Sequence, residues 1–257
     1  MIIKMKLKIN SVDLEFDSES FILTEKDDQL EYSIRKLSEM KDVLLDPSII
    51  NDANKDMPLY YMFRSAGMDK NSTVFEAHKI RYDVTVMVND RLGKEFNKTF
   101  GHYHPLAESN LSYPEIYEIF DGDALYILQR KKAEGYDVKL IKASKGDRVL
   151  MPPNYAHISV NVGKKPLVEA NLVSSKFDSD YNPIKQMAGG AVYVLSNNKI
   201  IVNKNYPNVI INYKDKPDSL QFLDNSKSLY DEYIAHPEHF DFLNKPSLLA
   251  AYGLIDQ

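Results

Sequence analysis

The chain has 257 residues, 44% of them hydrophobic and 27% charged, which is ordinary for a globular protein. It contains no cysteine, which excludes disulfides, thiolate metal ligands and a cysteine nucleophile. The net charge is −5 and no basic stripe stands out, so we expect no nucleic-acid partner. No apolar run approaches the ~18 residues of a membrane span, and the N-terminus lacks the apolar core of a signal peptide. We therefore expect no membrane association and a cytoplasmic location.

The N-terminal part, residues 1–57, is expected to supply strands and one helix that pack on the main domain. The helix is predicted over residues 24–40, because Leu30, Ile34 and Leu37 recur there at helical spacing.

The central part, residues 58–204, alternates short apolar runs with turn residues such as Asp121-Gly122 and Gly146-Asp147. Many short strands at such spacing favour an antiparallel sandwich or barrel. The predicted strands are Leu59–Phe63, Tyr82–Val88, Ile116–Phe120, Ala124–Leu128, Tyr136–Ile141, Arg148–Met151, His157–Val162, Leu167–Val173 and Ala191–Leu195.

The C-terminal part, residues 205–257, is predicted to be a mostly helical extension. Short helices are expected at residues 226–235, 237–243 and 246–253, two of which open with a proline near the first turn. The extension carries no recognisable catalytic motif, so we expect it to pack on the barrel or on a partner subunit.

Two histidines stand two residues apart in the stretch Thr99-Phe-Gly-His-Tyr-His-Pro105. In a strand, His102 and His104 point to the same face with Cα atoms ~6.6 Å apart, which suits two imidazoles that bind one ion. The alternative is a pair of histidines on an exposed strand face.

A carboxylate and a third imidazole follow in a suggestive context. Glu115 lies in Tyr113-Pro-Glu-Ile-Tyr-Glu118, and His157 ends the stretch that begins at Gly146-Asp147. Three imidazoles and one carboxylate suit Fe²⁺, Mn²⁺, Ni²⁺, Co²⁺ or Zn²⁺ and leave coordination positions open for substrate oxygens. His157 alone would more often be a buried structural histidine.

The order H-x-H, Glu, Gly-Asp-x₄-Pro and His resembles the two-part cupin signature. The details resemble the archaeal-type (cupin) phosphoglucose isomerases over roughly residues 25–205. The matching stretches are Ser33–Met40, Thr99–His104, Pro114–Tyr117 and Pro152–Asn161.

The resemblance implies a mainly β fold, a cupin (double-stranded β-helix, or jelly-roll) barrel with an N-terminal helix and a helical C-terminal extension. It implies a homodimer that interconverts glucose 6-phosphate and fructose 6-phosphate, a step of glycolysis and gluconeogenesis. One divalent metal per chain is implied, with Fe²⁺ as the candidate ion. The implied metal ligands are His102, His104, Glu115 and His157; the catalytic candidates are Glu115, Tyr117 and Tyr60; the substrate-binding candidates are Thr85, Thr99, Gly101 and Tyr181.

Several alternatives remain open from the sequence. Thr85 and Thr99 are β-branched and also suit simple strand packing. Ser179 stands where family members often place a histidine two residues before the tyrosine matched by Tyr181, so proton handling here needs another group or water.

The isomerisation can follow proton transfer through an enediolate, with Glu115 as base, or a metal-assisted hydride shift. Other functions are another cupin metalloenzyme, such as a mannose 6-phosphate isomerase or a dioxygenase, or a non-catalytic sugar-binding cupin.

Glu115 and Glu118 are three residues apart, so on one strand they face opposite sides. The resemblance of Pro-Glu-Ile-Tyr to the family stretch selects Glu115 as the ligand. Tyr117 then shares its face, and Glu118 points away from the ion.

Overall fold

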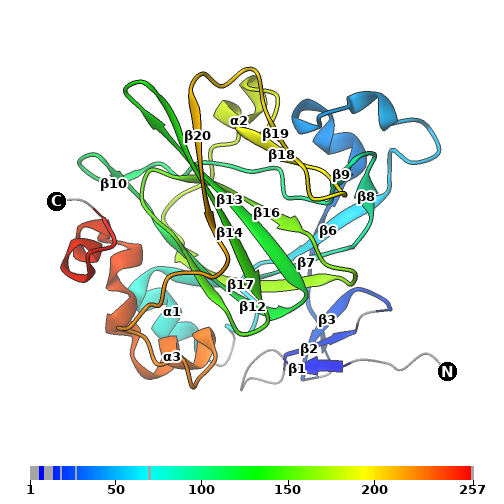
Figure 1. The fold of residues 1–257 in the computed structure, drawn as a ribbon. Helices are drawn as coiled ribbons and strands as arrows, with labels where there is room; N and C mark the ends of the chain where they lie inside the picture. The colour runs from blue at the N-terminus through cyan, green and yellow to red at the C-terminus, as the bar shows by residue number, and fades with distance from the viewer. Residues whose placement is uncertain (1–5, 9–13, 18, 27, 69–70, 256–257) are drawn as a thin grey trace.

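The computed structural model describes residues 6–8, 14–17, 19–26, 28–68 and 71–255 (Figure 1). Two sheets form the core of the fold, in the strand orders β15-β12-β17-β7-β6-β5 and β16-β13-β14-β20. The first sheet consists of β5 (Ser33–Lys36), β6 (Pro58–Phe63), β7 (Ile80–Met87), β12 (Glu115–Asp121), β15 (Arg148–Met151) and β17 (Leu167–Ser174). The second consists of β13 (Asp123–Lys132), β14 (Gly135–Ser144), β16 (Ala156–Asn161) and β20 (Val209–Lys214).

Smaller elements surround these sheets. They are β1 (Lys6–Lys8), β2 (Leu14–Asp17), β3 (Ile22–Glu25), β4 (Asp28–Gln29), β8 (Arg91–Leu92), β9 (Glu95–Phe96), β10 (Leu106–Glu108), β11 (Leu111–Ser112), β18 (Val192–Val194) and β19 (Ile200–Val202). The helices are α1 (Ser72–His78), α2 (Asn182–Gln186) and α3 (Leu229–Ala235), with the 3₁₀ helices η1 (Leu37–Val43), η2 (Pro47–Ile49), η4 (Pro237–Leu243) and η5 (Pro246–Tyr252).

The two sheets face each other across one apolar interior. Met87 and Tyr117 of the first sheet pack in one cluster with Tyr126, Leu128 and Ile141 of the second. This is the expected mainly β cupin barrel, and each of the nine predicted strands is present. The runs were predictable because their apolar residues fill both faces of strands buried between layers.

Strand alternation separates an apolar outer face from a partly polar inner one. On β7, Tyr82, Val84 and Val86 pack outward in a second cluster with residues of α3 and η4. Asp83 and Thr85 therefore point inward, toward the pocket described below. The helical extension thus covers the first sheet, while polar side chains gather inside the barrel.

The predicted N-terminal helix is wrong. The segment carries the short strands β3, β4 and β5 instead, and β5 pairs with β6 in the order Ser33 opposite Met62 and Arg35 opposite Tyr60. The apolar residues Leu37, Met40 and Val43 recur every third residue in the 3₁₀ helix η1, which follows directly. The spacing that suggested an α-helix therefore spans the end of a strand and a 3₁₀ turn. Residues 1–5 and 9–13 of the N-terminal part lie outside the described residues.

The C-terminal extension is attached to both sheets. Its three predicted helices are present as α3, η4 and η5, although the last two are 3₁₀ helices. The strand β20 was not predicted; it runs parallel to β14 at the edge of the second sheet, with Val209 opposite Tyr136. The extension therefore completes one sheet and covers the other.

Candidate active site

The residues predicted as metal ligands come together from three parts of the chain. His102 and His104 lie in the extended segment between β9 and β10, Glu115 opens β12, and His157 lies in β16. His102 forms an isolated β-bridge with His157, whose N–H donates to the His102 carbonyl at 3.2 Å. This bridge brings the H-x-H segment beside the second sheet.

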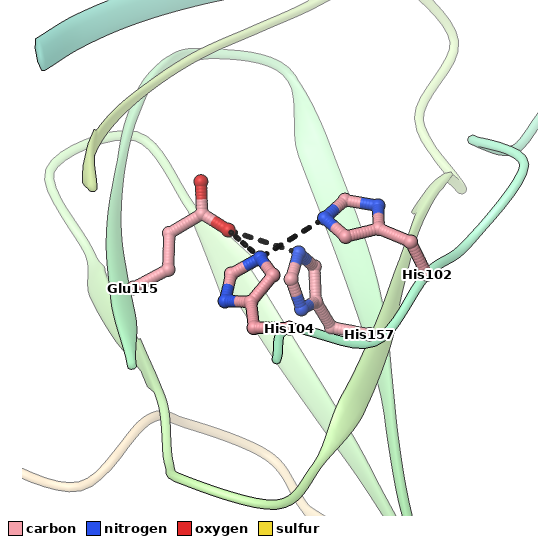
Figure 2. A group of neighbouring side chains, drawn as sticks. All are labelled: His102, His104, Glu115 and His157. Atoms are coloured by element: carbon pink, nitrogen blue, oxygen red, sulfur yellow. Dashed lines mark hydrogen bonds and ion pairs between the residues drawn. The ribbon is translucent and has the colours of Figure 1, made fainter. Parts of the chain in front are cut away.

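The four ligand atoms converge, all lying within 4.8 Å of one another. The Nε2 atoms of His102 and His104 are 3.1 Å apart. Glu115 Oε2 lies 3.0 Å from His157 Nε2 and 3.4 Å from His104 Nε2. Figure 2 shows these atoms directed toward a common point.

The donor set fits a divalent cation. Glu115 Oε2 is buried and has no hydrogen-bond partner among the described residues, although two imidazole nitrogens lie beside it. The Nδ1 of His104 lies 2.9 Å from the carbonyl of Tyr113, and since a carbonyl only accepts, Nδ1 must donate. The lone pair of His104 Nε2 is then free for a metal, as in many metal-bound histidines.

Burial keeps the imidazoles of His102 and His104 in the form that binds metal. Burial lowers the pKa of His104 to about 4 and, helped by the neighbouring histidines, lowers the pKa of His102 well below its ordinary value. Burial alone would raise the pKa of Glu115, but the contact of its Oε2 with His157 Nε2 and the charge of Arg81 lower it. At neutral pH the cluster therefore offers neutral imidazoles at His102 and His104 and an ionised carboxylate.

The three tyrosines singled out from the sequence line the same pocket as the four ligands. Tyr60 Oη accepts hydrogen bonds from Phe100 N–H and Arg35 Nε, both at 3.2 Å. Tyr117 Oη lies 3.5 Å from His157 Nε2. The ring centroid of Tyr181 is 5.2 Å from that of His102. These contacts fix three amphipathic side chains around the ion position.

Thr85, Thr99 and Gly101 also line this pocket. The Thr99 hydroxyl accepts from Ser159 N–H at 3.0 Å, so its own proton remains available to a ligand. Gly101 has φ +83°, and a Cβ added there would lie 2.5 Å from Ile158 Cγ1. Only glycine therefore fits this position beside His102.

A family model described as Glucose-6-phosphate isomerase (GPI) matches residues 34–211, more than half of the chain. The chain belongs to this family. The predicted resemblance is thereby confirmed.

Other glucose-6-phosphate isomerases are similar to the chain over most of their own length. A glucose-6-phosphate isomerase of Thermococcus litoralis is 27% identical over 175 residues, which cover 67% of this chain and 85% of the relative. One of Pyrococcus furiosus is 25% identical over 174 residues, covering 67% and 86%. Among solved structures, a cupin-like protein of Thermotoga maritima gives a TM-score of 0.31 at 18% identity and covers 46% of this chain and 69% of that one.

Part of the pocket wall is made of polar residues that were not predicted from the sequence. The additional lining residues are Met62, Arg64, Arg81, Phe100, Glu169, Asn171, Val173 and Ser179. The available signal was polar side chains inside apolar strands: Glu169 and Asn171 interrupt β17, and Arg81 shares its face of β7 with Thr85. Ser179, which stands where family members often place a histidine, also lies in the pocket.

Glu169 is a buried carboxyl group in this wall. Tyr126 Oη donates to Glu169 Oε2 at 2.6 Å, and the residue is only 1% exposed. Burial raises the pKa of Glu169 to about 7, with Glu115 adding to the effect. The pocket thus contains a second carboxyl group besides Glu115, and the pKa of this second group lies near neutral pH.

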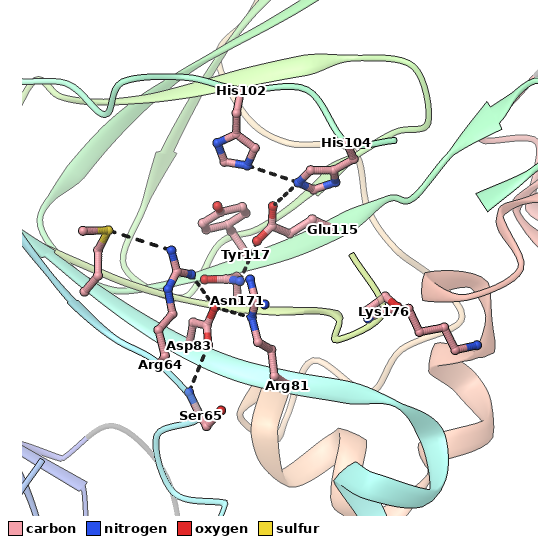
Figure 3. A network of polar contacts seen from close by, with 12 residues as sticks. Arg64, Ser65, Arg81, Asp83, His102, His104, Glu115, Tyr117, Asn171 and Lys176 are labelled. Carbon is pink, nitrogen blue, oxygen red and sulfur yellow. Dashed lines mark hydrogen bonds and ion pairs between the residues drawn. The ribbon is translucent and has the colours of Figure 1, made fainter. Parts of the chain in front are cut away.

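Asn171 holds the other oxygen of the candidate ligand Glu115, because its Nδ2 donates to Glu115 Oε1 at 2.5 Å (Figure 3). Asn171→Ala should weaken metal binding or lower kcat by roughly 10- to 100-fold, the usual effect of losing a group that orients a ligand. Metal titration and steady-state rates check this, with Asn89→Ala as the control, since Asn89 is exposed and outside the pocket. Wild-type values for both quantities in Asn171→Ala would show that Glu115 needs no such support.

None of the helices among the described residues combines the length and apolar character needed to cross a bilayer.

Proposed function

We propose that this protein interconverts glucose 6-phosphate and fructose 6-phosphate with one divalent metal ion per chain. The observation that carries the proposal is that the His/Glu cluster shares a single pocket with hydroxyl groups and Gly101. Membership of the glucose-6-phosphate isomerase family supports the substrate and the reaction. The activity would serve glycolysis and gluconeogenesis.

The proposed ligands are His102, His104, Glu115 and His157, with Fe²⁺ as the proposed ion and Mn²⁺, Ni²⁺, Co²⁺ and Zn²⁺ as alternatives. When bound, the ion supplies positive charge next to the two substrate oxygens on which negative charge develops during the reaction. Thr85, Thr99 and Gly101 are proposed to bind the phosphate.

Tyr60, Tyr117 and Tyr181 are proposed to hold the sugar. Burial raises the pKa of Tyr60 and, more strongly, of Tyr117, so both remain protonated at neutral pH. Each then presents an O–H donor to a sugar oxygen, and their rings help to exclude water from the reacting carbons.

The role of Glu115 separates the two routes of hydrogen transfer. In proton transfer, Glu115 takes the C2 proton and returns it to C1; in the hydride shift, the hydrogen moves directly and Glu115 acts as a ligand only. Both oxygens of Glu115 are engaged, one by Asn171 and the other beside the imidazoles. This engagement lowers its basicity and favours the hydride shift. Deuterium incorporation from D₂O at C1 or C2 would favour the base instead.

A coupled assay on fructose 6-phosphate, with and without a chelator, tests the proposal. We expect turnover that the chelator abolishes. Turnover of mannose 6-phosphate but not glucose 6-phosphate would indicate a mannose 6-phosphate isomerase. Oxygen consumption would indicate a dioxygenase. Binding of sugar phosphate without turnover of either sugar would indicate a binding protein and overturn the enzymatic proposal.

Thr99→Val should raise KM for fructose 6-phosphate by about tenfold or more, since a hydrogen bond to a charged group is removed. Steady-state kinetics measure this. Because valine also leaves Ser159 N–H without its acceptor, Thr99→Ser is the matched control: it keeps the hydroxyl and should keep KM near wild type. An unchanged KM in the valine variant would remove Thr99 from the phosphate site.

A homodimer is proposed on the family resemblance, and a cytoplasmic location on the lack of a signal-peptide pattern in the sequence. Size-exclusion chromatography with light scattering tests the first, and cell fractionation the second. The division into residues 1–57, 58–204 and 205–257 is likewise retained as a proposal, to be tested by limited proteolysis.

A further inference from the structure

Two guanidinium groups share one buried carboxylate on the pocket wall. Asp83 is 1% exposed and accepts hydrogen bonds from Arg64 Nη1 and from Arg81 Nε, the latter at 2.8 Å. Its other oxygen accepts from Ser65 N–H at 3.0 Å. Figure 3 shows both arginines reaching Asp83 from neighbouring segments. Asp83 is therefore fully satisfied and fixes the direction of both side chains.

Arg64 has a second amino group that lacks a strong acceptor. Among the described residues, Arg64 Nη2 donates to the thioether sulfur of Met62, at 3.8 Å. Sulfur of this kind accepts only weakly. The Arg64 side chain is 48% exposed although it lines the pocket. It thus offers the pocket a charged donor that an incoming ligand can use.

The register places this donor on the phosphate side of the pocket. Met62, next to Arg64 Nη2, is the cross-strand partner of Thr85. Arg81 lies on the other side of the pocket. Its cross-strand partner is Val173 of β17, and Val173 in turn lies opposite Glu115 of β12. Of the two guanidinium groups, that of Arg64 is therefore the one beside the proposed phosphate-binding hydroxyl.

We propose that Arg64 binds the phosphate group of the substrate and supplies the positive charge that Thr85, Thr99 and Gly101 lack. The inference rests on the proposed function for the identity of the substrate. A phosphate dianion meets a chain of net charge −5 and a pocket that contains Glu115 and Glu169. The neutral donors Thr85, Thr99 and Gly101 carry no charge of their own to offer the phosphate, whereas a guanidinium binds phosphate through charge-assisted hydrogen bonds.

The arrangement also keeps Arg64 ready to bind. Burial alone would lower the pKa of Arg64, but the charge of Asp83 and their hydrogen bond raise it above its ordinary value. Arg64 is therefore charged at neutral pH. Holding Nη1 on Asp83 leaves less side-chain freedom to lose when phosphate binds.

The test compares binding of inorganic phosphate to the metal-loaded wild type, Arg64→Met and Arg91→Met by calorimetry. Arg91 is the matched control, because it is exposed and stacks on Phe96 outside the pocket. We expect Arg64→Met to weaken phosphate binding by roughly 10- to 100-fold, as for loss of a charge-assisted hydrogen bond, and Arg91→Met to leave it unchanged. KM for fructose 6-phosphate should rise in parallel, with a small change in kcat.

The substitution should leave the fold intact, because Asp83 keeps Arg81 and Ser65 as partners. If Arg64→Met nevertheless misfolds, phenylglyoxal modification of the wild type gives the answer: phosphate should protect Arg64 but not Arg91. Equal phosphate affinity in wild type and Arg64→Met, absence of phosphate binding by the wild type, or no protection of Arg64 each overturn the inference. A wild type that binds phosphate through Arg64 but does not isomerise fructose 6-phosphate refutes the proposed function alone.

Discussion

Glu115→Gln is expected to lower kcat by several orders of magnitude and to loosen the metal, whereas Glu118→Gln should change kcat only a few-fold. Glu115 and Tyr117 face the pocket from β12, and Glu118 faces the opposite side of the sheet. There, Glu118 Oε2 accepts from Leu229 N–H at 2.7 Å, at the start of α3. Glutamine at 115 removes the negative charge that the ion needs. Glutamine at 118 still offers a carbonyl oxygen to Leu229.

The two variants are to be measured at saturating metal, with bound metal quantified and thermal unfolding recorded. Glu118 is buried against Arg148 and the extension, so Glu118→Gln should lower the thermal midpoint more than the rate. A nearly inactive Glu118→Gln beside an active Glu115→Gln would reverse the assignment, and the role proposed for Tyr117 would fall with it.

The barrel was predictable because its signals are local. Apolar strands separated by turns such as Asp121-Gly122 mark β12 and β13 wherever their partners lie. The N-terminal helix was mispredicted because helical spacing within residues 24–40 carries no information about β6, the strand with which β5 pairs. Tertiary pairing overrides such short patterns. The strand β20 was missed for the same reason, since its partner β14 is far away in sequence.

The candidate site likewise has residues that local motifs predict and residues that only the strand pairing brings to the pocket. All ten candidate site residues line one pocket. Four of them stand in the short H-x-H and Pro-Glu-x-Tyr motifs, and the resemblance to the family supplied the others. Arg64, Asp83 and Asn171 belong to no such motif. Their significance depends on register, which places Asn171 opposite both Asp83 and Tyr117. A one-residue shift in either pairing would send them to the outer face, so their contact with the site follows only from the structure.

Removal of the metal ion is expected to abolish isomerase activity while the barrel stays folded. The four ligands are held by strands and turns around an apolar interior that includes Leu59, Met87, Tyr126 and Leu128, so folding does not depend on the ion. Glu115 also keeps its hydrogen bond from Asn171 without metal. Circular dichroism should therefore be unchanged. The free energy of unfolding should fall by the binding free energy that the ion contributes, and the thermal midpoint should fall with it.

The measurement strips the protein with a chelator, records rate and circular dichroism, and then restores each of Fe²⁺, Mn²⁺, Ni²⁺, Co²⁺ and Zn²⁺ in turn. Metal analysis needs one control, because His236, Glu238 and His239 form a second group whose ligand atoms lie within 4.8 Å of one another. The variant His236→Ala removes this group from the count and should leave both the rate and the active-site metal intact. Full activity in metal-free protein would end the metalloenzyme proposal. Restoration by a single ion would instead identify the cofactor, since a site with open positions and imidazole ligands accepts several ions and only the rate distinguishes them.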